Sequence, residues 1–329
     1  MNMPAPDVAV LVVSWNTRAL LAECLQSIQD SAAHLAVQTL VVDNASSDGS
    51  AEMVRAQFPD VHLLALQDNQ GFVGGNNLAY SALQAAPRYV LLLNPDARLC
   101  PHSLAAMVSW MDANPNAGAC GPLTLNPDGT LQLSWTRFPT VWSEIRGRHD
   151  RRFGTNTARV ALTADALRRL PDAQIVDWAS GACLLVRGHA LTQNLGGVLF
   201  DPDFQMYSEE TDLCYRLRRA GYGTFFLPQA EAIHHYGKSS GQAQARTLRL
   251  LYGSKFLFMR KHYGPGPERL LKFGVALSSG LKWLAFALLG SLPTSRRDVL
   301  AVQRDRQRAV LSALRPSVPA PFPAPAART

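Results

Sequence analysis

The sequence predicts an α/β fold built on a doubly wound, mainly parallel sheet with flanking helices. Apolar runs of strand length alternate with segments of helical periodicity through the first third of the chain, an order typical of a parallel sheet. The runs lack polar alternation, as expected of strands buried on both faces. Polar clusters follow these runs, and ligands bind at the carboxyl ends of strands in such sheets. We therefore expect a ligand site along one edge of the sheet.

Four strands and four helices are expected in the first 120 residues. The strands are the apolar runs at 8–13, 39–43, 61–66 and 89–94. The helices are the periodic segments at about 18–31, 50–57, 74–86 and 101–113, with start signals at Asp48 and Pro101.

The second half of the chain is less regular. Residues 121–174 are expected to form a hairpin followed by a mobile, Arg-rich loop. Apolar order returns at 176–191, and residues 207–223 carry the signals of a helix: Ser208 as N-cap, acids in the first turn and Gly221 past the end. A short strand is expected over 224–227.

Composition narrows the class of protein. The chain has 329 residues, of which 47% are hydrophobic and 17% charged, enough to bury one large or two modest cores. Intrinsic disorder, collagen and disulfide scaffolds are thereby excluded for most of the chain. The five cysteines include no CxxC pair and are expected as small buried residues in a reducing compartment. No basic region precedes the first apolar run, which argues against a signal peptide and for the cytoplasmic side.

Charge divides the chain into an acidic part and a basic tail. Up to Tyr236 there are 16 basic and 22 acidic residues, whereas from Gly237 onward there are 16 basic and 3 acidic residues. A tail of this charge suits a nucleic acid or an anionic membrane surface, and we expect the membrane surface and no nucleic acid.

Within this tail, residues 246–292 are expected to bind the cytoplasmic face of the membrane. The 20-residue segment 273–292 is largely apolar, yet Ser278, Ser279 and Lys282 share one helical face. This pattern favours a helix lying in the interface over one that spans the bilayer. The alternative is a helix docked on the rest of the chain. Residues 296–329 are expected to be charged, then proline-rich, and disordered.

Acidic and amide side chains follow two of the predicted strands. Asp43 and Asn44 end one, and Asn94 and Asp96 follow another. One interpretation is helix and turn capping. The other is that one carboxylate accepts hydrogen bonds from a nucleotide base or ribose, while another holds Mg²⁺ or Mn²⁺ on a pyrophosphate. Convergence of several clusters on one sheet edge favours the ligand interpretation.

A glycine-rich turn at residues 69–77 enters the third predicted helix. Glycines let a backbone approach a ligand, and helix N-termini favour phosphates. The spacing is not GxGxxG, because two residues separate Gly71 from Gly74 and Gly75 adjoins. The turn also follows the third strand instead of the first, so nicotinamide binding is not favoured.

An acidic turn and a histidine pair complete the candidate groups. Glu209 and Glu210 point about 100° apart on a helix, so that one can face a cleft as a general base while the other is held structurally; acids at a helix start are also expected from the helix dipole alone. His234 and His235 follow the last short strand and belong either to the core or beside a carboxylate-held metal.

Seven blocks, in order, resemble the inverting GT-A glycosyltransferases of family 2, most closely the rhamnosyltransferase-like branch of bacterial cell-surface polysaccharide synthesis. The resemblance runs from about Val8 to Ser240, some 70% of the chain. The blocks are VVSWN, VVDNASSDGS, NQGFVGGNN, LLLNPDARL, SGACLLVRGHAL, FDPDFQMYSEETDLCYRLRRAGY and IHHYGKS.

The resemblance implies a nucleotide-sugar donor (dTDP- or UDP-), a lipid-linked or saccharide acceptor, and a divalent cation, Mg²⁺ or Mn²⁺. It places the donor on Ser14, Asn16, Asp43, Asn69, Gly71, Asn76 and Asn94. It assigns the metal to Asp96 and His234, with His235 as the alternative, and the base to Glu210, with Glu209 beside it. We expect Trp178 and Gly181 on the acceptor side. Two departures are Asn94 in place of the first acid of the DxD motif, and Glu in place of Asp at the base.

The resemblance also implies a domain plan and a location. Residues 1–240 form the catalytic domain, with a nucleotide-sugar half at 1–120 and an acceptor half at 121–240. Residues 241–295 are a basic, apolar helical segment, and the enzyme is expected as a peripheral protein on the cytoplasmic side of the bacterial inner membrane.

Two other classes of function stay open from the residues alone. A sugar nucleotidyltransferase would usually want a basic residue in an N-terminal glycine-rich loop, where SWNTR offers only Arg18. An inactive carbohydrate- or membrane-binding adaptor is the other. A retaining hydrolase would need a second carboxylate close to the first, and outside Glu209–Asp212 the sequence offers no clear pair.

Overall fold

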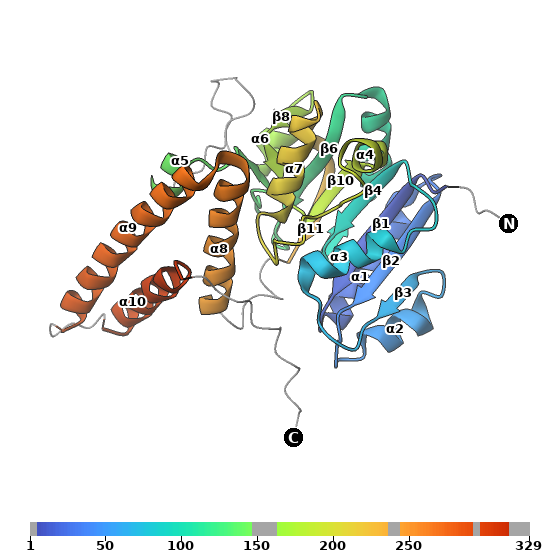
Figure 1. Ribbon diagram of the computed structural model, residues 1–329. Helices are drawn as coiled ribbons and strands as arrows, with labels where there is room; N and C mark the ends of the chain where they lie inside the picture. The colour runs from blue at the N-terminus through green and yellow to red at the C-terminus, as the bar shows by residue number, and fades with distance from the viewer. Residues whose placement is uncertain (1–4, 147–162, 236–243, 292–296, 316–329) are drawn as a thin grey trace.

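The computed structural model describes residues 5–146, 163–235, 244–291 and 297–315. Its centre is one twisted sheet, with strands in the order β3-β2-β1-β4-β10-β6-β11-β5 and β8 paired to β11 (Figure 1). The strands are β1 Val8–Ser14, β2 Val37–Asp43, β3 His62–Ala65, β4 Tyr89–Leu93, β5 Ala97–Leu99, β6 Ala117–Leu125, β8 Gln174–Val176, β10 Cys183–Arg187 and β11 Gly223–His234. A separate two-stranded sheet joins β7 Trp135–Thr136 to β9 Trp178–Ala179.

The prediction of a mainly parallel sheet is confirmed for the first half of the sheet only. Strands β3, β2, β1 and β4 are parallel neighbours. In the second half β10 runs antiparallel to both β4 and β6, and β11 is parallel to β6 but antiparallel to β5 and β8. The strand predicted over 224–227 is the start of the longer β11, and His234 is its last residue.

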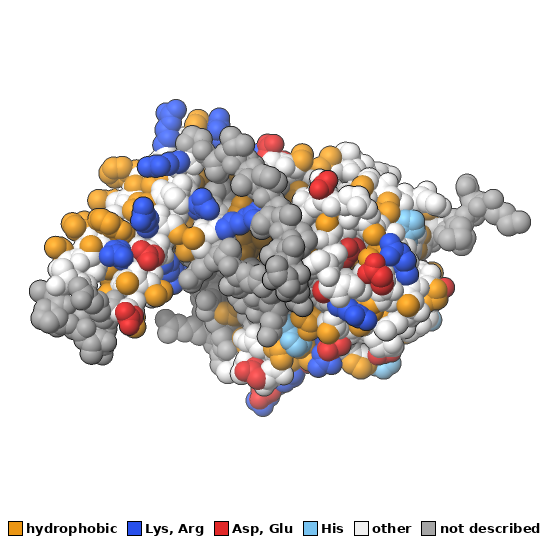
Figure 2. Space-filling view, turned by 90° about the horizontal axis from the view of Figure 1, so that it is seen from below, with side chains coloured by type: hydrophobic (Ala, Val, Ile, Leu, Met, Phe, Trp, Pro, Cys, Tyr) orange, Lys and Arg blue, Asp and Glu red, His pale blue; other side chains and the backbone are white. Residues whose placement is uncertain are grey.

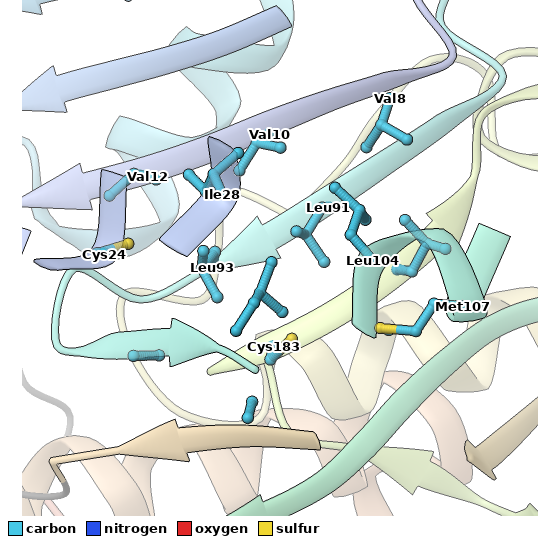
Figure 3. Close-up of a cluster of buried hydrophobic side chains, with 14 of the residues drawn as sticks. Val8, Val10, Val12, Cys24, Ile28, Leu91, Leu93, Leu104, Met107 and Cys183 are labelled. Carbon is cyan, nitrogen blue, oxygen red and sulfur yellow. The ribbon is translucent and has the colours of Figure 1, made fainter. Parts of the chain in front are cut away.

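Helices cover both faces of this sheet because alternate strand residues point to opposite sides. Val8, Val10 and Val12 of β1 pack toward α1 and α4, whereas Leu11 and Val13 pack toward α3 and α7. Figure 3 shows the first of these two clusters, with side chains from β1, β4, β10, α1 and α4 meeting in it. The helices of the sheet-based part are α1 Arg18–Ala32, α2 Ser50–Gln57, α3 Gly71–Ser81, α4 Ser103–Ala113, α5 Val141–Arg146, α6 Ala164–Arg168, the π-helix η1 Ala190–Asn194 and α7 Glu209–Arg219.

The five cysteines are free, and four of them are buried, as predicted. The predicted hairpin forms around a tight turn at Asn126–Thr130, where the Asn126 N–H donates to the Thr130 carbonyl and Gly129 has a φ of +81°. Most of the predicted mobile, Arg-rich loop, residues 147–162, lies outside the described residues.

Three further helices follow the sheet-based part: α8 Gln244–Tyr263, α9 Pro265–Ser291 and α10 Arg297–Ser312. Figure 1 shows α8 standing between the sheet and the pair formed by α9 and α10. The predicted disorder of 296–329 is wrong for 297–312, because Ala309 and Val310 of α10 are buried against α8 and α9. The proline-rich end, 316–329, lies outside the described residues.

One face of helix α8 packs on the sheet-based part, which was the alternative to membrane binding for the tail. Its Phe258 is fully buried in the same cluster as β1, α3 and α7. Other residues of the helix, such as Arg260, are exposed.

The close packing of α3 on β1 gives a stability prediction. A Cβ built on Gly75 would lie 2.7 Å from Cγ1 of Val13, a contact that forces backbone or side chains to shift. We expect Gly75→Ala to lower the free energy of unfolding by about 1 to 3 kcal/mol, measured by chemical denaturation. Gly253→Ala in α8 is the control, because that Cβ would meet nothing within 4 Å, and a loss of stability there as large as at Gly75 would contradict the packing argument.

Candidate active site

Polar side chains meet where the parallel strands β1, β2 and β4 end. Ser14 and Asp43 are the last residues of β1 and β2 and are register partners, and Asn94 directly follows β4. Ser14 and Asp43 are buried, because strands covered on both faces carry their final residues into the interior. The prediction that these clusters share one edge of the sheet is confirmed.

Asp43 is only half satisfied by its own fold. Its Oδ2 accepts the backbone N–H of Ser46 at 3.0 Å, whereas its buried Oδ1 has no hydrogen-bond partner among the described residues. Capping accounts for the first oxygen. A buried carboxylate oxygen without a donor is rare and costly, so the second oxygen is suited to a donor from a ligand.

Asn16 holds the loop after β2 in place. It is exposed and has a φ of +54°. Its Oδ1 accepts the backbone N–H of Ser47 at 2.8 Å, and its own N–H donates to Ser46 Oγ at 2.9 Å. The hydroxyl of Ser14 is paired with Thr17 Oγ1 at 2.9 Å. Ser14 and Asn16 therefore shape the edge around Asp43.

The glycine-rich turn is fastened to the end of β2. Gly71 has a φ of +73°, and its N–H donates to Asn69 Oδ1 at 2.8 Å. Asn44 donates to the carbonyl of Gly71 at 3.0 Å and accepts the N–H of Gln70 at 2.9 Å. Asn44 was missed as a site residue, although its place beside Asp43 at the strand end was a signal for it.

Asn76 has a local role. It is buried inside α3, and its Nδ2 donates to the carbonyl of Phe72, one turn earlier, at 2.9 Å. The neighbouring Asn77 forms a pair of hydrogen bonds with the backbone of Phe200, at 2.8 and 2.9 Å. Asn77 thereby ties α3 to the segment that leads into α7, a role that nothing in the local sequence indicates.

Asp96 and His234 lie together at the same edge. His234 Nε2 is 3.2 Å from Asp96 Oδ1 and 3.3 Å from Asn94 Nδ2, and both Asp96 and His234 are buried. His235 contacts Asp96 through its backbone, donating its N–H to the Asp96 carbonyl at 2.9 Å. The structure thus places the ring of His234 beside the Asp96 carboxylate.

Gln132 sets the orientation of the His234 ring. Its Oε1 is 2.7 Å from His234 Nδ1, while its Nε2 donates to Asn126 Oδ1 and to the His234 carbonyl. With the amide oriented in this way, Gln132 Oε1 accepts from Nδ1, and Nε2 faces the Asp96 carboxylate. The sequence could not reveal Gln132, which is 102 residues away from the histidine.

These groups fit a divalent cation. A neutral imidazole nitrogen and a carboxylate oxygen are both acceptors, so a cation between them would satisfy both. Metal-bound histidines usually donate their other ring N–H to a protein acceptor, and here Gln132 Oε1 lies beside Nδ1. Asn94 Oδ1 is buried and has no partner within the described ranges. In those same ranges, no group of three or more His, Cys, Asp or Glu side chains gathers, so a bound cation would take its further ligands from substrate or water.

The acidic turn at the start of α7 has an unusual backbone. Tyr207 and Ser208, which precede it, have φ values of +70° and +62°. Ser208 is the residue before the helix, as predicted, but in the described structure its side chain makes no capping hydrogen bond. Glu209 and Glu210 are the first two helical residues, and each has a buried Oε2 that lacks a hydrogen-bond partner among the residues described.

Gly181 lies directly against Glu210. A Cβ on Gly181 would be 3.5 Å from the Cβ of Glu210, and the carbonyl of the adjacent Ala182 accepts the N–H of Asn94 at 3.0 Å. The loop between β9 and β10 therefore joins the acidic turn to the Asn94 corner. Trp178 is half-buried on β9, and its indole N–H donates to the Arg137 carbonyl at 3.2 Å.

Burial makes both glutamates weak acids. Loss of hydration raises the pKa of Glu210 to about 7. Burial, and next the charge of Glu210, raise the pKa of Glu209 well above its usual value. Burial, and not repulsion from Glu209, is the cause of the raised pKa of Glu210. A carboxylate with a pKa of about 7 is suited to general-base chemistry near neutral pH.

Comparison with known proteins agrees with this geometry. The family model described as "Glycosyltransferase like family 2" matches residues 4–253. The N-acetylglucosaminyl-diphospho-decaprenol L-rhamnosyltransferase of Mycobacterium tuberculosis is 32% identical over 312 residues, which cover 90% of this chain and 98% of that protein. The rhamnosyltransferase WbbL of Escherichia coli is 26% identical over 58% of this chain and 70% of its own length.

A solved structure shares the fold. The mannosyltransferase PcManGT of Pyrobaculum calidifontis, determined with GDP-Man and Mn²⁺, matches with a TM-score of 0.55 and 19% identity over 94% of this chain and 86% of that chain. The mixed sheet with flanking helices is thus the GT-A arrangement, and the chain belongs to the glycosyltransferases of family 2.

Proposed function

We propose that this glycosyltransferase moves a sugar from a nucleoside-diphosphate donor to a hydroxyl group of a lipid-linked or saccharide acceptor, by single displacement with inversion. The observation that carries this proposal is Glu210, a half-buried residue set against Gly181, with a pKa of about 7 and a buried Oε2 that has no partner among the described residues. One base is enough for a single displacement, whereas retention would require a nucleophilic carboxylate as well.

The donor side is proposed on the edge formed by β1, β2 and the glycine-rich turn. Asp43 Oδ1 accepts a hydrogen bond from the base or ribose, on an edge shaped by Ser14, Asn16, Asn69 and Gly71. Asn76 supports the turn from inside α3. The names of the relatives from M. tuberculosis and E. coli favour rhamnose as the sugar, carried by dTDP or, alternatively, UDP.

Asp96 and His234 would hold Mg²⁺ or Mn²⁺, with Asn94 as a neighbouring donor. When bound, the cation supplies the charge that stabilises the departing diphosphate. Before Lys238 the chain has no lysine for this task, which leaves arginines and helix ends as its other positive groups. Gln132 keeps the His234 ring turned toward Asp96.

Glu210 takes the proton from the acceptor hydroxyl as that oxygen attacks the anomeric carbon from the side opposite the diphosphate. Gly181 leaves room beside the carboxylate because it has no side chain, and Trp178 lies on the strand that leads into this loop. We assign both residues to the acceptor side. Glu209 has the more buried side chain, and burial raises its pKa well above the usual value, so we assign it no proton-accepting role.

The acceptor is proposed to come from an anionic membrane surface that α9 contacts. By length and composition, α9 is the one helix in the described part of the chain that is apolar enough to cross a membrane. Six of its eight exposed large apolar residues recur at intervals of three and four and so share one face; this α9 stripe consists of Leu270, Phe273, Leu277, Leu281, Leu284 and Leu288. Figure 2 shows hydrophobic side chains together with Lys and Arg over this end of the molecule.

An apolar stripe with neighbouring cations suits a helix that lies in the membrane interface. Trp142 is 62% exposed on α5, a helix that packs on α9, where Ile145 of α5 would touch a Cβ on Gly274. We therefore place the enzyme as a peripheral protein on the cytoplasmic face of the membrane. Ser279, expected on the polar face, is buried, and Lys282 is exposed.

Donor recognition is tested with Asp43→Ala. Loss of a hydrogen bond to a charged group is worth about 1.5 to 3 kcal/mol, so nucleotide affinity should fall by about 10- to 150-fold. Asp43→Asn should show a similar or smaller loss. Thermal shifts with a panel of nucleoside diphosphates and nucleotide sugars, with and without Mn²⁺, report both the affinity and the preferred base. Asp128→Ala, on the exposed hairpin turn, is the control. Unchanged affinity together with a lower melting temperature for Asp43→Ala would favour capping alone.

The role of Glu210 is tested with Glu210→Gln, which keeps size and shape but removes the proton acceptor. Transfer should fall by about 10² to 10⁴ while nucleotide binding persists. In the wild type, transfer should rise with pH through about 7, where the carboxylate ionises. The folded-state pKa lies above the unfolded-state value of about 4.5, so the free energy of unfolding should fall as the pH rises from about 4.5 to about 7. Glu210→Gln should remove this pH-dependent loss. Should Glu209→Gln abolish transfer while Glu210→Gln retains it, Glu209 is the base.

Membrane contact is tested by placing charges on the α9 stripe. A double variant, Leu277→Glu with Leu281→Glu, should reduce flotation with phosphatidylglycerol vesicles about tenfold or more, given the usual value of a buried leucine. Ile175→Glu, at an exposed apolar position on β8, should float like the wild type. Release of the wild type by high salt indicates peripheral binding, whereas resistance to salt and carbonate would indicate a spanning helix. Equal flotation of the double variant and the wild type would contradict the assignment.

A further inference from the structure

The segment that aims the glutamates is strained and needs external support. Two consecutive residues without glycine's freedom, Tyr207 and Ser208, hold positive φ values, each of which costs on the order of 1 to 3 kcal/mol and persists only where surrounding structure enforces it. No side-chain cap from Ser208 helps within the described structure. Contacts from other elements must therefore hold the Tyr207–Ser208 turn.

Helix α8 contacts this segment before the turn. Lys261 Nζ lies 2.6 Å from both Asp201 Oδ2 and Asp203 Oδ2, and Ser254 Oγ donates to the carbonyl of Met206 at 2.8 Å. These contacts fix the chain immediately ahead of Tyr207.

The same helix also contacts the segment after the turn. His262 Nε2 donates to Asp212 Oδ1 at 2.7 Å, and both side chains are about nine-tenths buried or more. The other oxygen of Asp212 accepts from Arg216 Nε at 2.7 Å. Arg216 in turn donates to the carbonyls of Val198 and Leu199. Asp212 therefore links α8, through His262, to the start of the 198–206 segment, through Arg216.

Packing reinforces this polar link. The His262 ring lies 4.3 Å from the Tyr215 ring and 4.6 Å from the Phe258 ring, measured between centroids. Phe258 is fully buried. Asp212 therefore has a donor from each of two elements, and the first turn of α7 sits between α8 and the 198–206 segment.

We propose that His262 is a positioning residue for the transfer reaction: through Asp212 it holds the strained Tyr207–Ser208 turn and thereby sets Glu210 against Gly181. This rests on the proposed role of Glu210 but adds a group from a helix outside the predicted catalytic domain. His262 itself touches no reacting atom. It supplies one buried hydrogen bond that keeps the base in register with the acceptor side.

The test separates the hydrogen bond from the packing. His262→Phe keeps a ring against Tyr215 and Phe258 but cannot donate to Asp212, whereas His262→Gln can donate but has no ring. Arg260→Ala, on the same helix with an exposed side chain, is the matched control. All are made in the full chain and assayed with dTDP-rhamnose and a polyprenyl-diphospho-N-acetylglucosamine, alongside hydrogen exchange of peptides covering residues 206–213.

We expect His262→Phe to lower kcat by about 10- to 100-fold, the usual effect of a displaced catalytic group, with donor KM and nucleotide affinity within about twofold of the wild type. Amide exchange over 206–213 should accelerate in His262→Phe alone, and His262→Gln should recover most of kcat. Wild-type rates in His262→Phe, or a His262→Gln as impaired as His262→Phe, would overturn the proposal. If the wild type transfers sugar from none of the dTDP- and UDP-sugars of the thermal-shift panel to lipid-linked or saccharide acceptors, the proposed function fails, and unchanged exchange in His262→Phe would still overturn the positioning role independently.

Discussion

Two adjacent carboxylates buried at the start of one helix are the arrangement on which the rest of this structure depends. An unpaired buried carboxylate is expensive, and Glu209 and Glu210 each carry a buried oxygen with no partner among the described residues. The cost appears as raised pKa values. The surrounding structure holds the two glutamates in this position. Gly181 lies against Glu210, and α8 contacts the first turn of α7 through the bond between His262 and Asp212. The burial that is unfavourable for folding also raises the pKa of Glu210 into the range suited to a general base.

The edge of the sheet carries the groups that we propose for the donor and the cation. Its parallel strands deliver Ser14, Asp43 and Asn94 to one edge without any local signal beyond strand order, because parallel neighbours end together. The bond between the Asn94 N–H and the Ala182 carbonyl then connects this edge to the loop under Glu210. The groups proposed for the donor, the cation and the base thus come from separate stretches of chain joined by a few backbone contacts.

Four strands and four helices of the first 120 residues were predictable from local sequence: unbroken apolar strands, helix periodicity and polar strand ends. Asp43 was a candidate for the same reason, whereas local sequence offered Glu209 and Glu210 together and only the family resemblance chose Glu210. The short strand β5 was not expected, because its three residues carry no such pattern. Gln132, Asn77 and His262 were not, since each acts on a partner 50 to 123 residues away, and such pairing is decided by tertiary packing. The helix α10 was missed because its charged residues suggest disorder, whereas its apolar positions are buried by α8 and α9.

The stereochemical outcome of the reaction is the most direct test of Glu210 as the single base. The full chain, incubated with dTDP-L-rhamnose or the nucleotide sugar that gives the largest thermal shift, and with polyprenyl-diphospho-N-acetylglucosamine, should yield a glycoside whose anomeric configuration, read by NMR coupling constants, is opposite to that of the donor. A product of retained configuration would require a nucleophilic carboxylate and would contradict Glu210 as the single base. Free sugar without glycoside would show that water, and no acceptor hydroxyl, is the nucleophile that this site activates.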